Sequence, residues 1–154
     1  MNPVVQLREE ISIELEAITQ VVRELVFLNQ DLGKQAPTIR EKTAAAAFLA
    51  QFYNGIENIL KRICISYEVR LPEGDNWHVA LFKMFSSPSQ SPLPTLFDDN
   101  LAEILAPYRR FRHVVFHSYG FQLEWNKMVH GIEEIEPVFA KVELAIRQFL
   151  NSID

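Results

Sequence analysis

One short segment of the chain concentrates the residue types that move protons and bind phosphate. Its arginines are Arg109, Arg110 and Arg112, and its histidines are His113 and His117. A histidine side chain has an unperturbed pKa of about 6.5, so it can give or take a proton near neutral pH. An arginine carries a permanent charge on a planar fork that binds phosphate oxygens. Together the two residue types have the chemistry that metal-independent RNA cleavage needs.

The same residues also suit a plain structural interpretation. A charge run is most often a solvated helix face, here with one or two buried histidines, and on residue types alone this interpretation comes first. The chain is acidic, with 15 Lys and Arg against 20 Asp and Glu and a net charge of −5. No global positive field therefore attracts nucleic acid. An RNA would need a local basic patch, for which Arg109, Arg110 and His113 are candidate phosphate contacts.

The sequence offers little for metal or cofactor chemistry. His113 and His117 are four residues apart and share a helix face, so they are possible metal ligands. No carboxylate pattern completes that set, and the nearest acidic residue is Glu124. The chain has no Gly-rich phosphate loop and no Ser or Cys nucleophile motif, which disfavours NTP hydrolysis and acyl transfer. We expect neither a metal nor a cofactor.

The spacing Arg112-x4-His117-x-Tyr119 resembles the R-x(4–6)-H-x-Y signature of the HEPN superfamily, in its HepT-type toxin branch. The stretch at residues 52–63, FYNGIENILKRI, is similar to that branch as well, and chain length and helical order agree over most of the chain. The resemblance implies one all-α, HEPN-like domain over residues 1–154. It implies an up-and-down bundle of four to five helices that forms a homodimer.

The resemblance also implies a function. HepT-type proteins are ribonuclease toxins, and their partner, a minimal nucleotidyltransferase antitoxin (MntA), adenylylates the tyrosine of the motif. Carried over, Arg112 and His117 are the catalytic pair that cleaves tRNA or mRNA, and Tyr119 is the modified residue. Without the resemblance, Tyr119 is equally a core aromatic. The alternative function is a non-catalytic HEPN-like module that binds a nucleotidyltransferase or a nucleotide.

Helix geometry complicates the catalytic pair. At about 100° per residue, Arg112 and His117 lie ~140° apart on a straight helix, whereas Arg110 aligns with His113 and His117. Two arrangements reconcile the motif with this geometry. The helix loosens just before Gly120, or the site combines residues from both protomers of a dimer.

Two polar residues interrupt an otherwise apolar helix. Glu57 and Asn58 lie between isoleucines and are candidates to orient His117 or Arg112. A solvent-facing helix surface is the commoner explanation for such a pair. We interpret the remaining conspicuous side chains as packing or interface residues, namely Trp77, His78, Trp125, His130 and Cys64.

The elements that must position these residues are helices. Only five glycines occur in 154 residues, and apolar residues recur at three- and four-residue steps over long stretches, as on a buried helix face. The predicted first helix opens at Asn2-Pro3 and stops at Gly33. The predicted second helix opens at Pro37 and ends before Pro72.

Later boundaries follow from capping signals and prolines. Asp75 is expected to cap a short helix over residues 76–85, and a Ser/Pro-rich loop follows over residues 86–94. Asn100 opens the helix that carries the basic segment, and Gly120 ends it. Pro107 is expected to kink this helix or to split off its first turn. The cleanest apolar stripe belongs to the last helix, which is expected to bend at Pro137.

Composition fits a globular protein. The chain is 48% hydrophobic and 23% charged, close to average usage, which excludes a disordered chain. A single cysteine excludes a disulfide framework. With no run of about 18 apolar residues and no signal-peptide pattern, we expect a cytoplasmic protein without a membrane segment.

Overall fold

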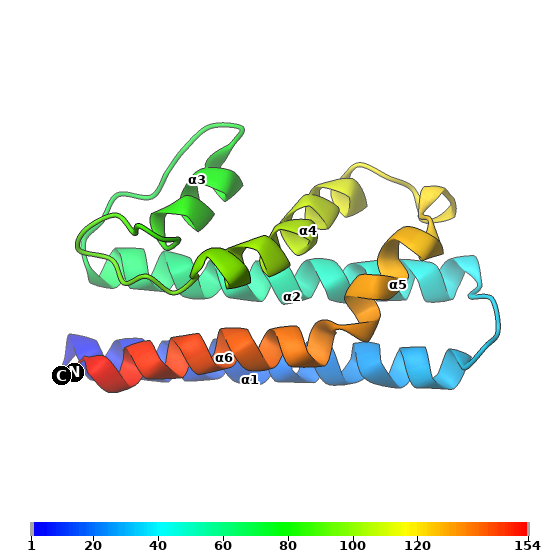
Figure 1. Ribbon diagram of the computed structural model, residues 1–154, viewed down its shortest axis with the longest axis horizontal. Helices are drawn as coiled ribbons and strands as arrows, with labels where there is room; N and C mark the ends of the chain where they lie inside the picture. The colour runs from blue at the N-terminus through cyan, green and yellow to red at the C-terminus, as the bar shows by residue number, and fades with distance from the viewer. Residues whose placement is uncertain (1, 154) are drawn as a thin grey trace.

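The computed structural model describes residues 2–153, and its regular structure over that range is entirely helical. This confirms the all-α prediction, with six α-helices instead of four to five. The elements are α1 (Pro3–Leu32), α2 (Ile39–Ser66), α3 (Trp77–Met84), α4 (Asp99–Phe116), the 3₁₀ turn η1 (Gly120–Gln122), α5 (Trp125–Glu133) and α6 (Ile135–Ser152). In Figure 1, α2 lies in the middle, with α1 and α6 on one side and α3 and α4 on the other.

The first helix begins and ends where the sequence predicts. The Asn2 Oδ1 atom accepts a hydrogen bond from the Val4 backbone N–H at 2.8 Å, and Pro3 occupies the first helical position. At the other end Gly33 has a φ of 55°, a left-handed conformation that glycine adopts without strain.

The second helix begins later than predicted. Its N-cap is Thr38, so Pro37 lies before the helix and not at its first position. The Thr38 hydroxyl accepts from the Glu41 N–H at 3.1 Å, and the Glu41 carboxylate accepts from the Thr38 N–H at 2.9 Å. This capping box satisfies two free amides at once, which proline cannot do.

The N-caps of α3 and α4 also differ from the prediction. Helix α3 follows Asn76 instead of Asp75, and no side chain caps it. Helix α4 follows Asp98, whose Oδ1 accepts from the Leu101 N–H at 2.8 Å. Asp98 and Asn100 are equally good caps in sequence, and Asp98 is the one whose side chain reaches a free amide. The predicted Ser/Pro-rich loop between α3 and α4 is confirmed.

The basic helix ends earlier than predicted. Helix α4 continues through Pro107, stops at Phe116 and has His117 as its C-cap. Gly120 begins η1 and does not adopt a left-handed conformation. Its role is close packing, because a Cβ atom at this position would overlap the Thr43 Oγ1 of α2. Sequence alone does not distinguish a glycine that turns the chain from one that makes room.

The predicted last helix is two helices. Helix α5 ends at Glu133 and α6 begins at Ile135, with Glu134 as the junction. Pro137 lacks the N–H that would bond the Glu133 carbonyl, and its ring crowds that carbonyl. The expected bend is therefore a break, which explains the sixth helix.

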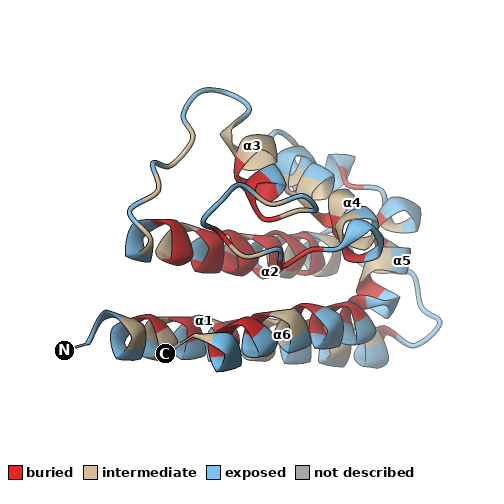
Figure 2. Cartoon of the chain, turned by 60° about the vertical axis from the view of Figure 1, so that its left-hand side comes forward, coloured by how far each residue is buried: buried red, intermediate tan, exposed pale blue. Residues whose placement is uncertain are grey.

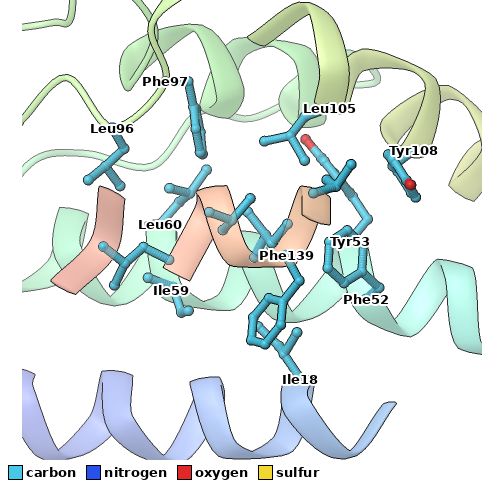
Figure 3. Packing of buried hydrophobic residues seen from close by; sticks show 14 of the residues in the cluster. Ile18, Phe52, Tyr53, Ile59, Leu60, Leu96, Phe97, Leu105, Tyr108 and Phe139 are labelled. Atoms are coloured by element: carbon cyan, nitrogen blue, oxygen red, sulfur yellow. The ribbon is translucent and has the colours of Figure 1, made fainter. Parts of the chain in front are cut away.

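The core lies on the faces that α1, α6 and α4 turn toward α2. Figure 2 shows buried residues along these inner faces and exposed residues outside. In Figure 3, Phe52 of α2 lies near Tyr108 of α4 and Phe139 of α6, with ring centroids 5.3 and 6.2 Å away. Helices α1 and α2 approach closely at Gly55, where a Cβ atom would overlap Ile18. None of the helices over residues 2–153 combines the length and the apolar character that a membrane crossing requires.

Candidate functional site

A buried carboxylate marks the site. Glu57 is 1% exposed and is the one fully buried charged side chain among residues 2–153. It lies on α2 between Tyr53 and Leu60, which are both buried on the same helix face. An unpaired charge in such a place costs several kcal/mol, so its partners are expected to be specific.

The partners of Glu57 come from α3 and α4, and a further α2 residue contacts one of them. The Glu57 Oε2 atom lies 2.6 Å from His78 Nδ1, and Oε1 lies 3.5 Å from Arg112 Nε. Arg112 Nε also donates to Asn54 Oδ1, and Arg112 Nη1 lies 3.0 Å from His78 Nε2. We call Asn54, Glu57, His78 and Arg112 the Glu57 cluster.

Donor chemistry fixes the protonation state of His78. A guanidinium only donates hydrogen bonds, so His78 Nε2 must accept from Arg112. The proton of the ring is then on Nδ1, which donates to the Glu57 carboxylate. The cluster therefore joins a cation, a neutral imidazole and an anion in one chain of hydrogen bonds.

The guanidinium of Arg112 is only partly used by these contacts. Its Nε and Nη1 atoms are held, while Nη2 makes no hydrogen bond to any residue between 2 and 153. The side chain is 20% exposed, and its Cζ lies 4.9 Å from the centre of the Phe116 ring. An arginine anchored on one side and open on the other is suited to bind a phosphate oxygen.

Aromatic rings surround the cluster. The Trp77 ring lies against His78, with centroids 3.4 Å apart, and Lys61 Nζ lies 4.4 Å from the centre of a Trp77 ring. The Tyr53 hydroxyl is buried and forms no hydrogen bond with any residue from 2 to 153. Burial raises the pKa of Tyr53 far above its usual value, and the nearby Glu57 charge raises it further. Tyr53 therefore stays protonated, and we assign it no proton transfer.

The two histidines of the basic segment lie elsewhere. His113 and His117 are exposed, with ring centroids 4.1 Å apart and planes tilted by 32°. Arg110 is exposed too. Within residues 2–153, no hydrogen bond or ion pair connects Arg112 to His117, although α4 ends just before His117. The end of the helix therefore does not bring the two motif residues together within one chain.

Tyr119 lies on the surface. Its side chain is 71% exposed, and its ring stacks on Phe121 with centroids 5.6 Å apart and planes within 5°. Its backbone N–H donates to Gln122 Oε1 at 2.7 Å. The alternative interpretation of Tyr119 as a core aromatic is therefore wrong.

Glu57 and Asn58, the two polar residues predicted on α2, lie in different environments. Glu57 is buried against Arg112, which contradicts a solvent-facing position, whereas Asn58 is exposed. The Asn58 amide lies 3.5 Å from Glu14 of α1, so it points away from the Glu57 cluster. Asn58 therefore does not orient either residue of the motif.

Sequence reasoning missed two members of the cluster, His78 and Asn54. The interpretation of His78 as a plain packing residue is incomplete, because both of its ring nitrogens face charged partners. A signal was available: His78 precedes the buried Leu81 by three residues, which places it on the inner face of α3. Likewise Arg112 follows the buried Leu105 by seven residues, on the inner face of α4.

Metal ligation finds no support in the side-chain arrangement. The segment from residue 2 to residue 153 contains no group of three or more His, Cys, Asp or Glu placed to hold a metal ion. Cys64 is a buried free cysteine, and burial raises the pKa of its thiol to about 11. His113 and His117 are not joined by Glu124, which pairs with Lys127 at 2.6 Å.

Comparison with known proteins identifies the family. A family model described as HepT-like protein matches residues 44–153, which include the whole Glu57 cluster, His117 and Tyr119. No significant match was found among curated proteins or among solved structures. Because the match covers more than half of the 154 residues, the chain belongs to the HepT-like family.

Proposed function

We propose that the protein is the metal-independent endoribonuclease toxin of a toxin–antitoxin pair. The observation that carries the proposal is Arg112, whose guanidinium is anchored inside a HepT-like chain and leaves Nη2 free. In the proposed reaction this free edge binds the scissile phosphate and stabilises the charge of the phosphorane. One well-placed donor of this kind contributes ~3–4 kcal/mol to catalysis.

His117 supplies the proton transfer in this proposal. It acts as general base on a ribose 2′-OH or as general acid on the leaving 5′-oxygen, giving a 2′,3′-cyclic phosphate and a 5′-hydroxyl. Since His117 and Arg112 face apart within one chain, the Arg112 of one protomer acts with the His117 of the other. Exposed apolar side chains at this end of α4 support a homodimer contact there: Val114, Phe116, Tyr119 and Phe121.

Substrate recognition is electrostatic. Arg110 and His113 are exposed beside His117, and Arg109 lies on the inner side of α4, 5.0 Å from the centre of the Phe82 ring. Arg110 and His113 are therefore the two additional side chains that face solvent and can contact neighbouring phosphates of tRNA or mRNA.

Neutralisation occurs at Tyr119 in this proposal. A minimal nucleotidyltransferase antitoxin transfers AMP from ATP to the hydroxyl and releases pyrophosphate; the 71% exposure of the side chain leaves the hydroxyl accessible. The resulting phosphodiester adds a negative charge close to the basic end of α4. That charge competes with the RNA phosphate for the same cations.

The test is incubation of the purified protein with total RNA in EDTA, followed by end-group analysis. We expect new 2′,3′-cyclic phosphate and 5′-hydroxyl ends, abolished by His117→Gln. The matched control is His130→Gln, because His130 is also an exposed histidine but lies on α5. Absence of cleavage in EDTA, or cleavage unchanged by His117→Gln, would contradict the proposal.

One observation favours a second candidate, a non-catalytic module that binds a nucleotidyltransferase or a nucleotide. The charge of Arg112 is already balanced by Glu57 inside the protein. For this candidate the same experiment gives no new RNA ends, while the protein still forms a complex with the nucleotidyltransferase.

A further inference from the structure

We propose that His78 is a positioning residue for Arg112: its neutral imidazole holds the guanidinium so that the free Nη2 edge meets the RNA phosphate. The inference rests on the proposed ribonuclease function. It adds a residue of α3 that lies 34 positions before Arg112 in the sequence and outside the Arg112–His117–Tyr119 motif.

The first argument concerns how many atoms fix a guanidinium. Asn54 and Glu57 both contact Arg112 at one nitrogen, Nε. Contacts at a single nitrogen leave the plane of the fork free to turn. The contact between Nη1 and His78 Nε2 at 3.0 Å adds a second point. With the covalent bond from Nε to Cδ, these two contacts fix the plane and hence the direction of Nη2.

The second argument concerns how His78 is itself held. Its Nδ1–H donates to Glu57 Oε2 at 2.6 Å, a short, charge-assisted hydrogen bond that orients the ring. Trp77 covers the ring at 3.4 Å between centroids. The imidazole is therefore fixed before it meets Arg112, as a positioning group must be.

The third argument concerns protonation. A second proton on His78 would place an Nε2–H group against Arg112, which has only N–H groups to offer, so the contact would be lost. Charged groups that face the ring are Glu57 from α2 and Arg112 from α4, while Lys61 of α2 lies over the adjacent Trp77. The contact with Arg112 therefore requires that the Nε2 atom of His78 carry no proton.

The test compares two substitutions of His78. In His78→Gln the amide keeps one acceptor for Arg112 and one donor for Glu57 but does not titrate, whereas His78→Ala removes both contacts. We expect His78→Ala to lower kcat for RNA cleavage about 100-fold, the size of a misplaced catalytic group, with little change in KM. We expect His78→Gln to stay within about threefold of the wild type.

The control and the contrary outcome are defined by the same assay. His130→Gln should change neither kcat nor KM, since His130 is exposed on α5. A His78→Gln protein that folds, by circular dichroism, yet is as inactive as His78→Ala would overturn the inference. Such a result would assign proton transfer to His78.

A second measurement on the wild-type protein needs no RNA cleavage. Nitrogen-15 NMR of the histidine rings should show His78 with its proton on Nδ1, and the Arg112 Nε–H should be protected from exchange. Protonation on Nε2 instead would overturn the inference. If the Nδ1–H tautomer and the protection are found but no RNA is cut, the positioning contact stands and the ribonuclease proposal alone fails.

Discussion

The side chains of the basic segment lie in opposite environments on the two faces of α4. On the inner face, Arg112 is held by Asn54, Glu57 and His78, with its guanidinium on Phe116. On the outer face, the rings of His113 and His117 lie 4.1 Å apart and are open to solvent. A five-residue spacing produces this split, because it turns the second residue ~140° away from the first.

The difference separates two tasks within one short motif. The inner side is rigid and pre-arranged, which suits a group that must hold a phosphate in one place. The outer side is exposed, which suits groups that meet a second molecule, whether RNA, another protomer or a modifying partner. Each prediction below asks whether the two sides respond differently to substitution.

The largest effect is expected from removing the buried charge. Glu57→Ala should lower the free energy of unfolding by about 3–5 kcal/mol, because Arg112 loses its counter-charge and His78 its acceptor. Urea unfolding measures the loss. Glu133→Ala, at an exposed position of α5, should change stability by less than about 0.5 kcal/mol. Equal losses for the two variants would contradict a special role for the inner face.

Substitutions of the proposed catalytic pair, Arg112 and His117, should separate activity from stability. Arg112→Lys and His117→Gln should each reduce RNA cleavage by ~3–4 kcal/mol in transition-state stabilisation, about 100- to 1000-fold. Only Arg112→Lys should also lower stability, by about 1–2 kcal/mol, because lysine keeps the charge but cannot bridge Asn54 and His78. Cleavage kinetics and thermal unfolding of both variants decide this. A destabilised His117→Gln protein would remove the distinction between the two faces.

A smaller effect is expected at Gly120, where η1 packs on α2. Gly120→Ala should cost about 1–3 kcal/mol, because the added methyl group overlaps Thr43 Oγ1. The double variant Gly120→Ala, Thr43→Ala should recover much of the loss, since the overlapping atom is gone. Failure of that recovery in urea unfolding would mean that η1 does not pack on α2 as described.

The smallest effect on fold and activity is expected at Tyr119. Tyr119→Phe keeps the ring and its stacking on Phe121 but removes the hydroxyl at which we propose that an antitoxin adds AMP. Stability and RNA cleavage should be unchanged, while neutralisation by co-expressed antitoxin is lost. Intact-mass measurement checks the mechanism, because a fully neutralised but unmodified wild-type protein would point to inhibition by binding.

The fold class was predictable because it depends on periodicity, which many residues report together. The apolar stripes of α1, α2 and α6 are visible in the sequence and are buried as predicted. Helix boundaries were less predictable, because they depend on which of two nearby residues reaches a free amide. Thr38 is the N-cap of α2, which was expected to begin at Pro37. Asp98 is the N-cap of α4, where Asn100 was expected.

The candidate site was predictable only in the parts that residues close together in the sequence indicate. The motif drew attention to Arg112, and an acid within an apolar helix drew attention to Glu57. The contact of Arg112 with His78 joins residues 34 positions apart, and no local spacing indicates it. Counting around each helix predicts that Arg112 and His78 face inward, yet the choice of partner depends on how α3 packs on α2 beside α4.

The packing of α1 bears on where the protein can be divided. The family match begins at residue 44, beyond the end of α1 at Leu32. Helix α1 nevertheless buries seven apolar residues, mostly against α2. The recognisable segment and the folding unit therefore differ: a fragment of residues 44–153 keeps the chemistry-bearing side chains but exposes the apolar face of α2. Helix α1 contributes this apolar contact together with two carboxylates, Glu10 and Glu14, which pair with Arg62 of α2.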